Sequence, residues 1–130
     1  MKKILILALS LSILPVFAAD WMEIGNKAYV DLSSIKDEGG YIYALKKVMD
    51  GAAMKPVNGK KAGWYTSYDA YDCTNKKYQN KTVVSYGFDG QVLEKINYTG
   101  GSWKNATPET KDALWLEEIC RVSKLPRQGY

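Results

Sequence analysis

Residues 64–99 read WYTSYDAYDCTNKKYQNKTVVSYGFDGQVLEKINYT, and this stretch decides the fold. Asn75-Lys76-Lys77 turns the chain once, and Asp89-Gly90 turns it again, because glycine tolerates the positive φ that a tight hairpin needs. Between these turns the chain is rich in aromatic and β-branched residues, which favour strands. The stretch therefore predicts three successive antiparallel strands at the centre of a sheet, over 64–74, 78–88 and 91–99.

The chain before this stretch predicts further strands of the same sheet. Segments 21–24 and 28–32 are predicted to form a first hairpin. Segment 41–49 has an alternating pattern and is rich in Tyr, Ile and Val, which predicts another strand. Residues 31–35 look like a strand end followed by a short helical turn. Gly51 to Ala62, with a proline, an Asn-Gly pair and three lysines, predicts an exposed loop. We expect about five to six strands in all.

The chain after the sheet predicts one C-terminal helix over 107–122. Thr107-Pro108-Glu109 supplies a hydroxyl cap, a proline at the first helical position and an acid in the first turn. Trp115, Ile119 and Val122 share one face by their i, i+4, i+7 spacing. The expected class is therefore α+β, an antiparallel sheet packed against a C-terminal helix, with residues 123–130 as a flexible tail.

Residues 1–18 have the anatomy of a secretory signal peptide. Lys2 and Lys3 precede the apolar run 4–14, and Val16-Phe17-Ala18 fits the small-residue cleavage rule, with Ala19 as the alternative site. No second candidate span follows, and no cysteine stands where a bacterial lipoprotein is acylated. We expect a bacterial chain cut after Ala18, with one domain over 19–122, that is soluble in the periplasm, at the cell surface or secreted.

The two cysteines, Cys73 and Cys120, are expected to form a disulfide. Nothing keeps thiols reduced in the compartment to which the signal sends the chain. Cys73 falls in a predicted strand and Cys120 near the end of the predicted helix. The bond would tie the helix to the sheet, and a loop of this size contributes roughly 4 kcal/mol in the chain-entropy model.

Strand alternation divides the side chains of 64–74 between two faces. The face of Cys73 carries Tyr65, Ser67, Asp69 and Tyr71, unless a bulge reverses the parity. Trp64 and Tyr68 then point the other way, and we expect them to be exposed contact residues. Trp21 and Trp103 are expected to plug the core at the ends of the sheet.

The charge is mild and excludes little except nucleic acid. The net charge falls from +4 to +2 when Lys2 and Lys3 leave with the signal, which does not favour a nucleic-acid partner. Lysines cluster in or beside predicted turns, where they either attract an acidic partner or are simply solvated. These clusters are Lys46 with Lys47, Lys55 with Lys60 and Lys61, and Lys76 with Lys77 and Lys81.

The residue types argue against an enzyme. The chain has no histidine, which removes the usual general base and the commonest transition-metal ligand. Both cysteines are used in the bridge, and no phosphate loop or metal motif occurs. The carboxylates Asp69 and Asp72, and Glu117 and Glu118, are expected to diverge rather than to cleave a sugar. We therefore expect no catalytic residue, no metal and no cofactor.

A series of motifs resembles the surface-adhesin protein E family of bacterial envelope proteins over about residues 20–121. The resemblance implies an antiparallel sheet against a C-terminal helix, with the Cys73–Cys120 disulfide. It also implies an outward-facing role in contact with host extracellular-matrix and serum proteins, and of its residues only the cysteine pair is carried over. The motifs are Trp21, YVDLSSI at 29–35, YDCTNKKY at 71–78, VVSY at 83–86, FDGQVL at 88–93, Trp103, Thr107-Pro108 and Ile119-Cys120.

Two functions remain open at this stage. The first is a non-enzymatic binding module that contacts host matrix or other envelope proteins through Trp64, Tyr68, Lys55, Lys60 and Lys61. The second is a periplasmic structural or stress-associated domain with no host ligand. A hydrolase would need a deep cleft with convergent carboxylates. The sequence predicts no oligomeric state.

Overall fold

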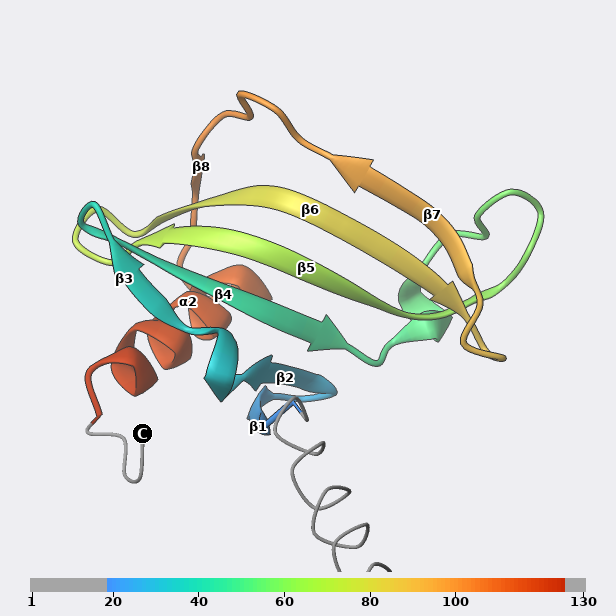
Figure 1. Cartoon of the computed structure of the whole chain (residues 1–130), viewed down its shortest axis with the longest axis horizontal. Coiled ribbons are helices and arrows are strands. Elements are labelled where there is room, and N and C mark those ends of the chain that lie inside the picture. Colours follow the sequence, from blue (N-terminus) through green and yellow to red (C-terminus); the bar gives the residue numbers. More distant parts are fainter. Residues whose placement is uncertain (1–18, 126–130) are drawn as a thin grey trace, which may run out of the picture.

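The computed structural model describes residues 19–125, which form one antiparallel sheet with a helix packed on one face (Figure 1). The strand order is β1-β2-β4-β5-β6-β7, and every pairing is antiparallel. The predicted signal segment and residues 126–130 lie outside the described residues. The strands of this order are β1 (Trp21–Gly25), β2 (Ala28–Asp31), β4 (Tyr41–Val48), β5 (Ala62–Asp72), β6 (Lys77–Gly87) and β7 (Val92–Asn97).

Two short strands extend the predicted set. β3 (Lys36–Glu38) pairs with β4, and β8 (Lys104–Asn105) pairs with β6. Strands of three and two residues carry too little alternation to be read from sequence. The six longer strands confirm the expected sheet, and β5 ends one residue before Cys73.

The predicted turns form as expected. Gly90 has a φ of +85° and donates its N–H to the carbonyl of Gly87, which closes the β6–β7 hairpin. The helical turn expected near residues 31–35 is η2 (Leu32–Ser34), capped by the Asp31 carboxylate, which accepts from the N–H of Ser33. The long connection after β4 contains a second short turn, η3 (Gly51–Ala53).

The helix α2 (Lys111–Ser123) begins later than predicted. Its N-cap is Thr110, whose hydroxyl accepts from the N–H of Ala113 at 3.3 Å. Glu109 has a φ of +70°, a left-handed conformation that cannot belong to an α-helix, so residues 107–109 form a turn before it. Ser123 belongs to α2, and Lys124 is its C-cap. No helix among residues 19–125 is long and apolar enough to cross a membrane.

The core lies between α2 and one face of the sheet, which we call the inner face. Apolar side chains from β1, β2 and β4 meet the buried face of the helix there. In β5 the inner face carries Ser67, Asp69 and Tyr71, all buried, as alternation predicts. The β5–β6 pairing contains two bulges. One has Gly63 of β5 as its extra residue and the other has Lys81 of β6, so β5 keeps its parity from Trp64 to Asp72. The buried apolar side chains of this core include Ile24, Val30, Val48, Leu116, Ile119 and Val122.

Two expectations about individual side chains were wrong. Trp21 and Trp103 are partly exposed, the first beneath the ammonium of Lys47 and the second against the ring of Tyr41. The buried tryptophan is Trp115 of α2, whose position in the helix faces the sheet. Lys46, expected at a solvated turn, is 4% exposed because its side chain points to the inner face.

Candidate functional site

The face of the sheet opposite α2, the outer face, carries aromatic rings in stacked pairs. Trp64 of β5 stacks on Tyr86 of β6, with ring centroids 5.2 Å apart and planes 13° apart. Tyr68 stacks on Tyr43 of β4, with ring centroids 6.2 Å apart and an angle of 26° between the ring planes. All four side chains are partly exposed. In a stacked pair the ring faces contact one another, so the ring edges and the tyrosine hydroxyls are the parts turned to solvent.

Lysine side chains lie over two aromatic rings of this face, Trp21 and Tyr43. The Lys47 ammonium lies 4.4 Å from the ring centroid of Trp21, and that of Lys36 lies 5.7 Å from the Tyr43 ring. Both contacts are within the range of a cation–π attraction. The outer face therefore combines apolar edges, hydroxyls and cations, which is the composition of a surface that recognises proteins.

The three loop lysines of the sequence prediction lie in the connection between β4 and β5 or at its end. Lys55, Lys60 and Lys61 are exposed, and none forms an ion pair among residues 19–125. The loop is pinned at Asn58, whose amide donates to the carbonyl of Leu93 in β7 at 3.0 Å. Figure 1 shows this loop projecting beyond the ends of β4 and β7.

A pocket of about 760 Å³ opens at the base of the loop, and we call it the loop-base pocket. It brings Lys61 and Trp64 together, whereas Lys55, Lys60 and Tyr68 do not line it. Sequence reasoning missed this pocket, because its wall joins the end of β4, η3 and the β6–β7 turn. Its apolar lining comes from Met49, Ala52, Met54, Pro56, Ala62, Trp64 and Phe88.

The charges of the loop-base pocket are unevenly paired. Its single carboxylate, Asp50, lies 3.6 Å from the ammonium of Lys27 and 3.9 Å from that of Lys111 in α2. Lys61 is the remaining cation of the lining and has no ion-pair partner among the described residues. A positive surplus is therefore left in the lining of the pocket.

The inner face holds a buried polar cluster centred on Asp69. Its carboxylate accepts from Ser67 at 2.5 Å, Tyr71 at 2.9 Å and Asn80 at 2.8 Å, and it pairs with Lys46 at 3.4 Å. Burial, and then the charge of Asp69, raises the pKa of Tyr71 well above its ordinary value. The cluster is closed to solvent, so it joins sheet strands to one another rather than offering a site.

The helix Trp115 completes this cluster from above. The Lys46 ammonium lies 4.2 Å from the centroid of the Trp115 ring, which links β4 to α2. The same causes, burial first and the charge of Asp69 second, raise the pKa of Tyr65 to about 12. The signal for Lys46 was present in the sequence, since it shares parity with the apolar Ala44 and Val48.

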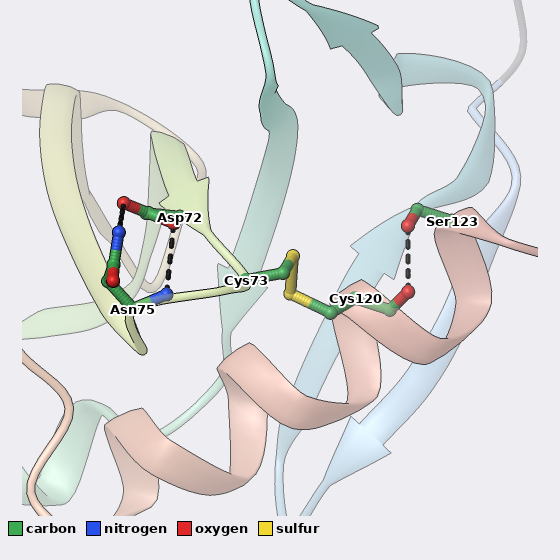
Figure 2. The surroundings of a disulfide bond; sticks show 5 residues. All are labelled: Asp72, Cys73, Asn75, Cys120 and Ser123. Carbon is green, nitrogen blue, oxygen red and sulfur yellow. Dashed lines mark hydrogen bonds between the residues drawn. A yellow bond between two sulfur atoms is a disulfide. The ribbon is translucent and has the colours of Figure 1, made fainter.

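The predicted disulfide is present at the opposite end of β5 from the loop-base pocket. Cys73 and Cys120 are bonded, with Cα atoms 6.0 Å apart, and the bond joins the end of the sheet to α2 (Figure 2). Asp72 accepts from the backbone and side chain of Asn75, which lowers the pKa of that carboxyl. Ser123 donates to the carbonyl of Cys120 at 2.7 Å.

The expected carboxylate pairs do not converge. Asp69 is buried in the inner cluster, while Asp72 is engaged with Asn75 in the turn after β5. Glu118 is held by the guanidinium of Arg121 at 2.8 Å, which lowers the pKa of Glu118. Within residues 19–125, no group of three or more His, Cys, Asp or Glu side chains is placed to hold a metal ion.

Comparison with known proteins adds a family and a fold. The sequence profile described as "Surface-adhesin protein E" matches residues 21–121. Solved structures of Haemophilus influenzae protein E are similar in fold. Its selenomethionine form is 17% identical, with a TM-score of 0.54, covering 81% of this chain and 93% of that one.

A second protein E structure, from non-typeable Haemophilus influenzae, is 16% identical with a TM-score of 0.53. It covers 84% of this chain and 80% of that chain. No protein of the curated set matched this sequence. At these identities the structural likeness establishes the fold, in agreement with the sheet, the C-terminal helix and the disulfide described above.

Proposed function

This chain belongs to the surface-adhesin protein E family, and we propose that it is a non-enzymatic binding module of a bacterial cell envelope that holds a protein partner. We propose further that the chain is exported and that its partner is a host extracellular-matrix or serum protein, or another protein of the envelope. The binding surface in this proposal is the outer face together with the basic loop.

The observation that carries the proposal is the aromatic outer face, whose rings remain partly exposed among the described residues. Trp64 and Tyr68, the two contact residues expected from sequence, each stack on a ring of a neighbouring strand and remain partly exposed. Stacking restrains these side chains before a partner arrives, so little rotamer entropy is lost on binding. Rigid aromatic anchors of this kind carry much of the energy of protein interfaces.

The loop lysines give the proposed partner its charge. Lys55, Lys60 and Lys61 are exposed and unpaired among the described residues, so they are available to carboxylates of a partner. Exposed charges at the rim of an interface mainly raise the rate of association and make it sensitive to salt. We therefore expect an acidic partner and salt-dependent binding.

A plate assay with immobilised matrix and serum proteins tests the proposal. The chain is produced with its own N-terminal segment and purified from the periplasm. The double variant Trp64→Ala, Tyr68→Ala and the triple variant Lys55→Ala, Lys60→Ala, Lys61→Ala should both lose binding. Tyr98→Ala, an exposed aromatic beyond β7, and a Lys77→Ala, Lys81→Ala, Lys124→Ala triple serve as matched controls.

Equal retention of the wild-type chain and both site variants would contradict the proposed surface. Cell fractionation with protease shaving of intact cells tests the location. A chain confined to the periplasm that retains no host protein would instead support the structural or stress-associated domain.

A further inference from the structure

We propose that the loop-base pocket is a socket for one large apolar side chain of an acidic protein segment. This inference rests on the proposed function, in which the partner is a protein, and names the chemistry of the part that is held. It is tested with a peptide and with signals from the pocket lining, so its outcome is distinguishable from that of the plate assay.

The lining of the pocket fits an apolar anchor. Phe88 is 71% exposed and Met49 is 41% exposed, although both are large apolar side chains, and both face this one pocket. Burying them against a partner side chain removes apolar surface from water. A volume of about 760 Å³ lies within the range of pockets that bind compact ligands. Met49 and Met54 add flexible thioether side chains that adapt to the shape of an occupant.

The positive surplus of the lining favours carboxylates beside that anchor. Asp50 lies between Lys27 and Lys111, which leaves Lys61 with no counter-charge among the described residues. A segment with Asp or Glu next to its apolar residue supplies this counter-charge, whereas a basic segment is repelled.

Part of the pocket wall is fixed by close backbone contacts between η3, the start of β5 and the β6–β7 turn. A Cβ on Gly51 would lie 2.6 Å from the carbonyl oxygen of Gly63, so η3 sits directly on the start of β5. A Cβ on Gly63 would lie 3.2 Å from the Cα of Phe88, so β5 in turn sits against the β6–β7 turn. These close approaches hold the walls in place before an occupant enters, which lowers the entropy lost on binding.

The pocket also continues into the outer face. Trp64 lines the pocket and stacks on Tyr86, so one side chain belongs to both surfaces. A segment seated in the pocket therefore runs onto the aromatic outer face, where its neighbouring residues meet ring edges and hydroxyls.

Methionine methyl NMR provides a direct test, because the chain carries its own reference signal. After residue 18 the methionines are Met22, Met49 and Met54, and only the last two line the pocket. The probe is the blocked peptide Asp-Glu-Phe-Glu-Asp, added to the periplasmic chain labelled at its methionine methyl groups. The Met49 and Met54 signals should shift while the Met22 signal stays, and an Ala-for-Phe peptide should bind about tenfold more weakly.

Variants of the chain give matched controls. Lys61→Glu should weaken the peptide by about fivefold or more, and Lys60→Glu, a neighbour on the same loop that does not line the pocket, by less than about twofold. Phe88→Ala removes a wall of the pocket, while Leu114→Ala removes a comparably exposed apolar side chain from α2. Only the first should weaken binding.

The outcomes separate this inference from the proposed function. Peptide that leaves Met49 and Met54 unshifted, or that shifts Met22 equally, overturns the socket, even if the plate assay retains a partner. Shifts produced by phosphatidylglycerol vesicles and not by the peptide also overturn it, in favour of a lipid. A peptide-specific shift supports the socket. It does so even if the plate assay retains no partner, a result that would contradict the proposed function alone.

Discussion

The ammonium of Lys46 lies 3.4 Å from the carboxylate of Asp69, and their side chains are only 6% and 1% exposed. The pair joins β4 to β5 directly beneath Trp115 of α2. Two hydroxyls and one amide also donate hydrogen bonds to the carboxylate. Its buried negative charge is therefore compensated by hydrogen bonds as well as by Lys46. Such a group is stable only as a complete set, because each member would be costly to bury alone.

Removing the negative charge should therefore destabilise the fold strongly. Asp69→Asn keeps the size of the side chain but leaves Lys46 buried without a counter-charge, and loss of one partner of a buried pair costs about 3–5 kcal/mol. Urea unfolding monitored by circular dichroism measures the change. Asp37→Asn, an exposed carboxylate of β3, should change the free energy of unfolding by less than about 0.5 kcal/mol.

A second substitution checks the cause. Lys46→Met in the Asp69→Asn background removes the unpaired cation and should recover a large part of the lost stability, since neutral replacements of buried pairs are often tolerated. A double variant no more stable than Asp69→Asn alone would show that the hydrogen bonds, and not the charge, carry the effect.

Alternation along β5 explains why the outer face could be predicted. Trp64 and Tyr68 stand at even positions of the strand, whereas the buried Ser67 and Asp69 stand at odd positions. This local pattern separates the two faces without knowledge of the neighbouring strands. The disulfide also followed from two cysteines and a predicted export signal. These features depend on short stretches of chain.

The remaining features depend on contacts between distant segments. The burial of Lys46 requires Asp69 opposite it, and only the β4–β5 register, with Lys46 beside Ser67, brings them together. The loop-base pocket needs η3, the start of β5 and Phe88 in one place. At the helix start the sequence predicts Thr107 as the cap. The left-handed conformation of Glu109 excludes it, so Thr110 caps α2 instead, and no local rule predicts that conformation.

Loss of the disulfide should lower stability by a large fraction of the total. The bond spans 47 residues, and closing a loop of this length contributes roughly 4 kcal/mol. The Cys73→Ala, Cys120→Ala variant should show this loss in urea unfolding. A reductant should reproduce it in the wild-type chain and have no effect on the variant, and an equal response of both to reductant would contradict the explanation.

Alkaline pH should destabilise the fold through two partly buried tyrosines. Burial, and then the charge of Asp69, raises the pKa of Tyr65 from 10.0 to about 12, and burial, and then Asp112, raises that of Tyr78 to about 12. A folded-state pKa above the unfolded value means that the folded state holds the proton more tightly. This contribution to stability is complete below pH 10 and is lost as the pH rises from 10 to 12.

The Tyr65→Phe variant isolates this effect from the lysines that titrate in the same range. Its free energy of unfolding should fall less steeply than that of the wild-type chain over this range, and part of the late rise in tyrosinate absorbance at about 295 nm should disappear. Tyr98→Phe, at an exposed position, is the matched control. Parallel slopes for all three chains would remove Tyr65 from the account.

Gly51→Ala should disturb the loop-base pocket through the backbone. The added Cβ would run into the carbonyl oxygens of both Ala62 and Gly63, which are backbone atoms that cannot rotate away. The start of β5 or η3 must therefore move, and overpacking of this kind costs about 1–3 kcal/mol. Because Met49 and Met54 flank η3, their methyl signals should change in the free protein, and the acidic Phe peptide should bind more weakly.

Gly101→Ala, where the nearest atom would be 3.6 Å from the new Cβ, should leave stability and both signals unchanged. If Gly51→Ala costs stability while the methyl signals and peptide binding remain as in the wild-type chain, then η3 does not form the wall of the pocket.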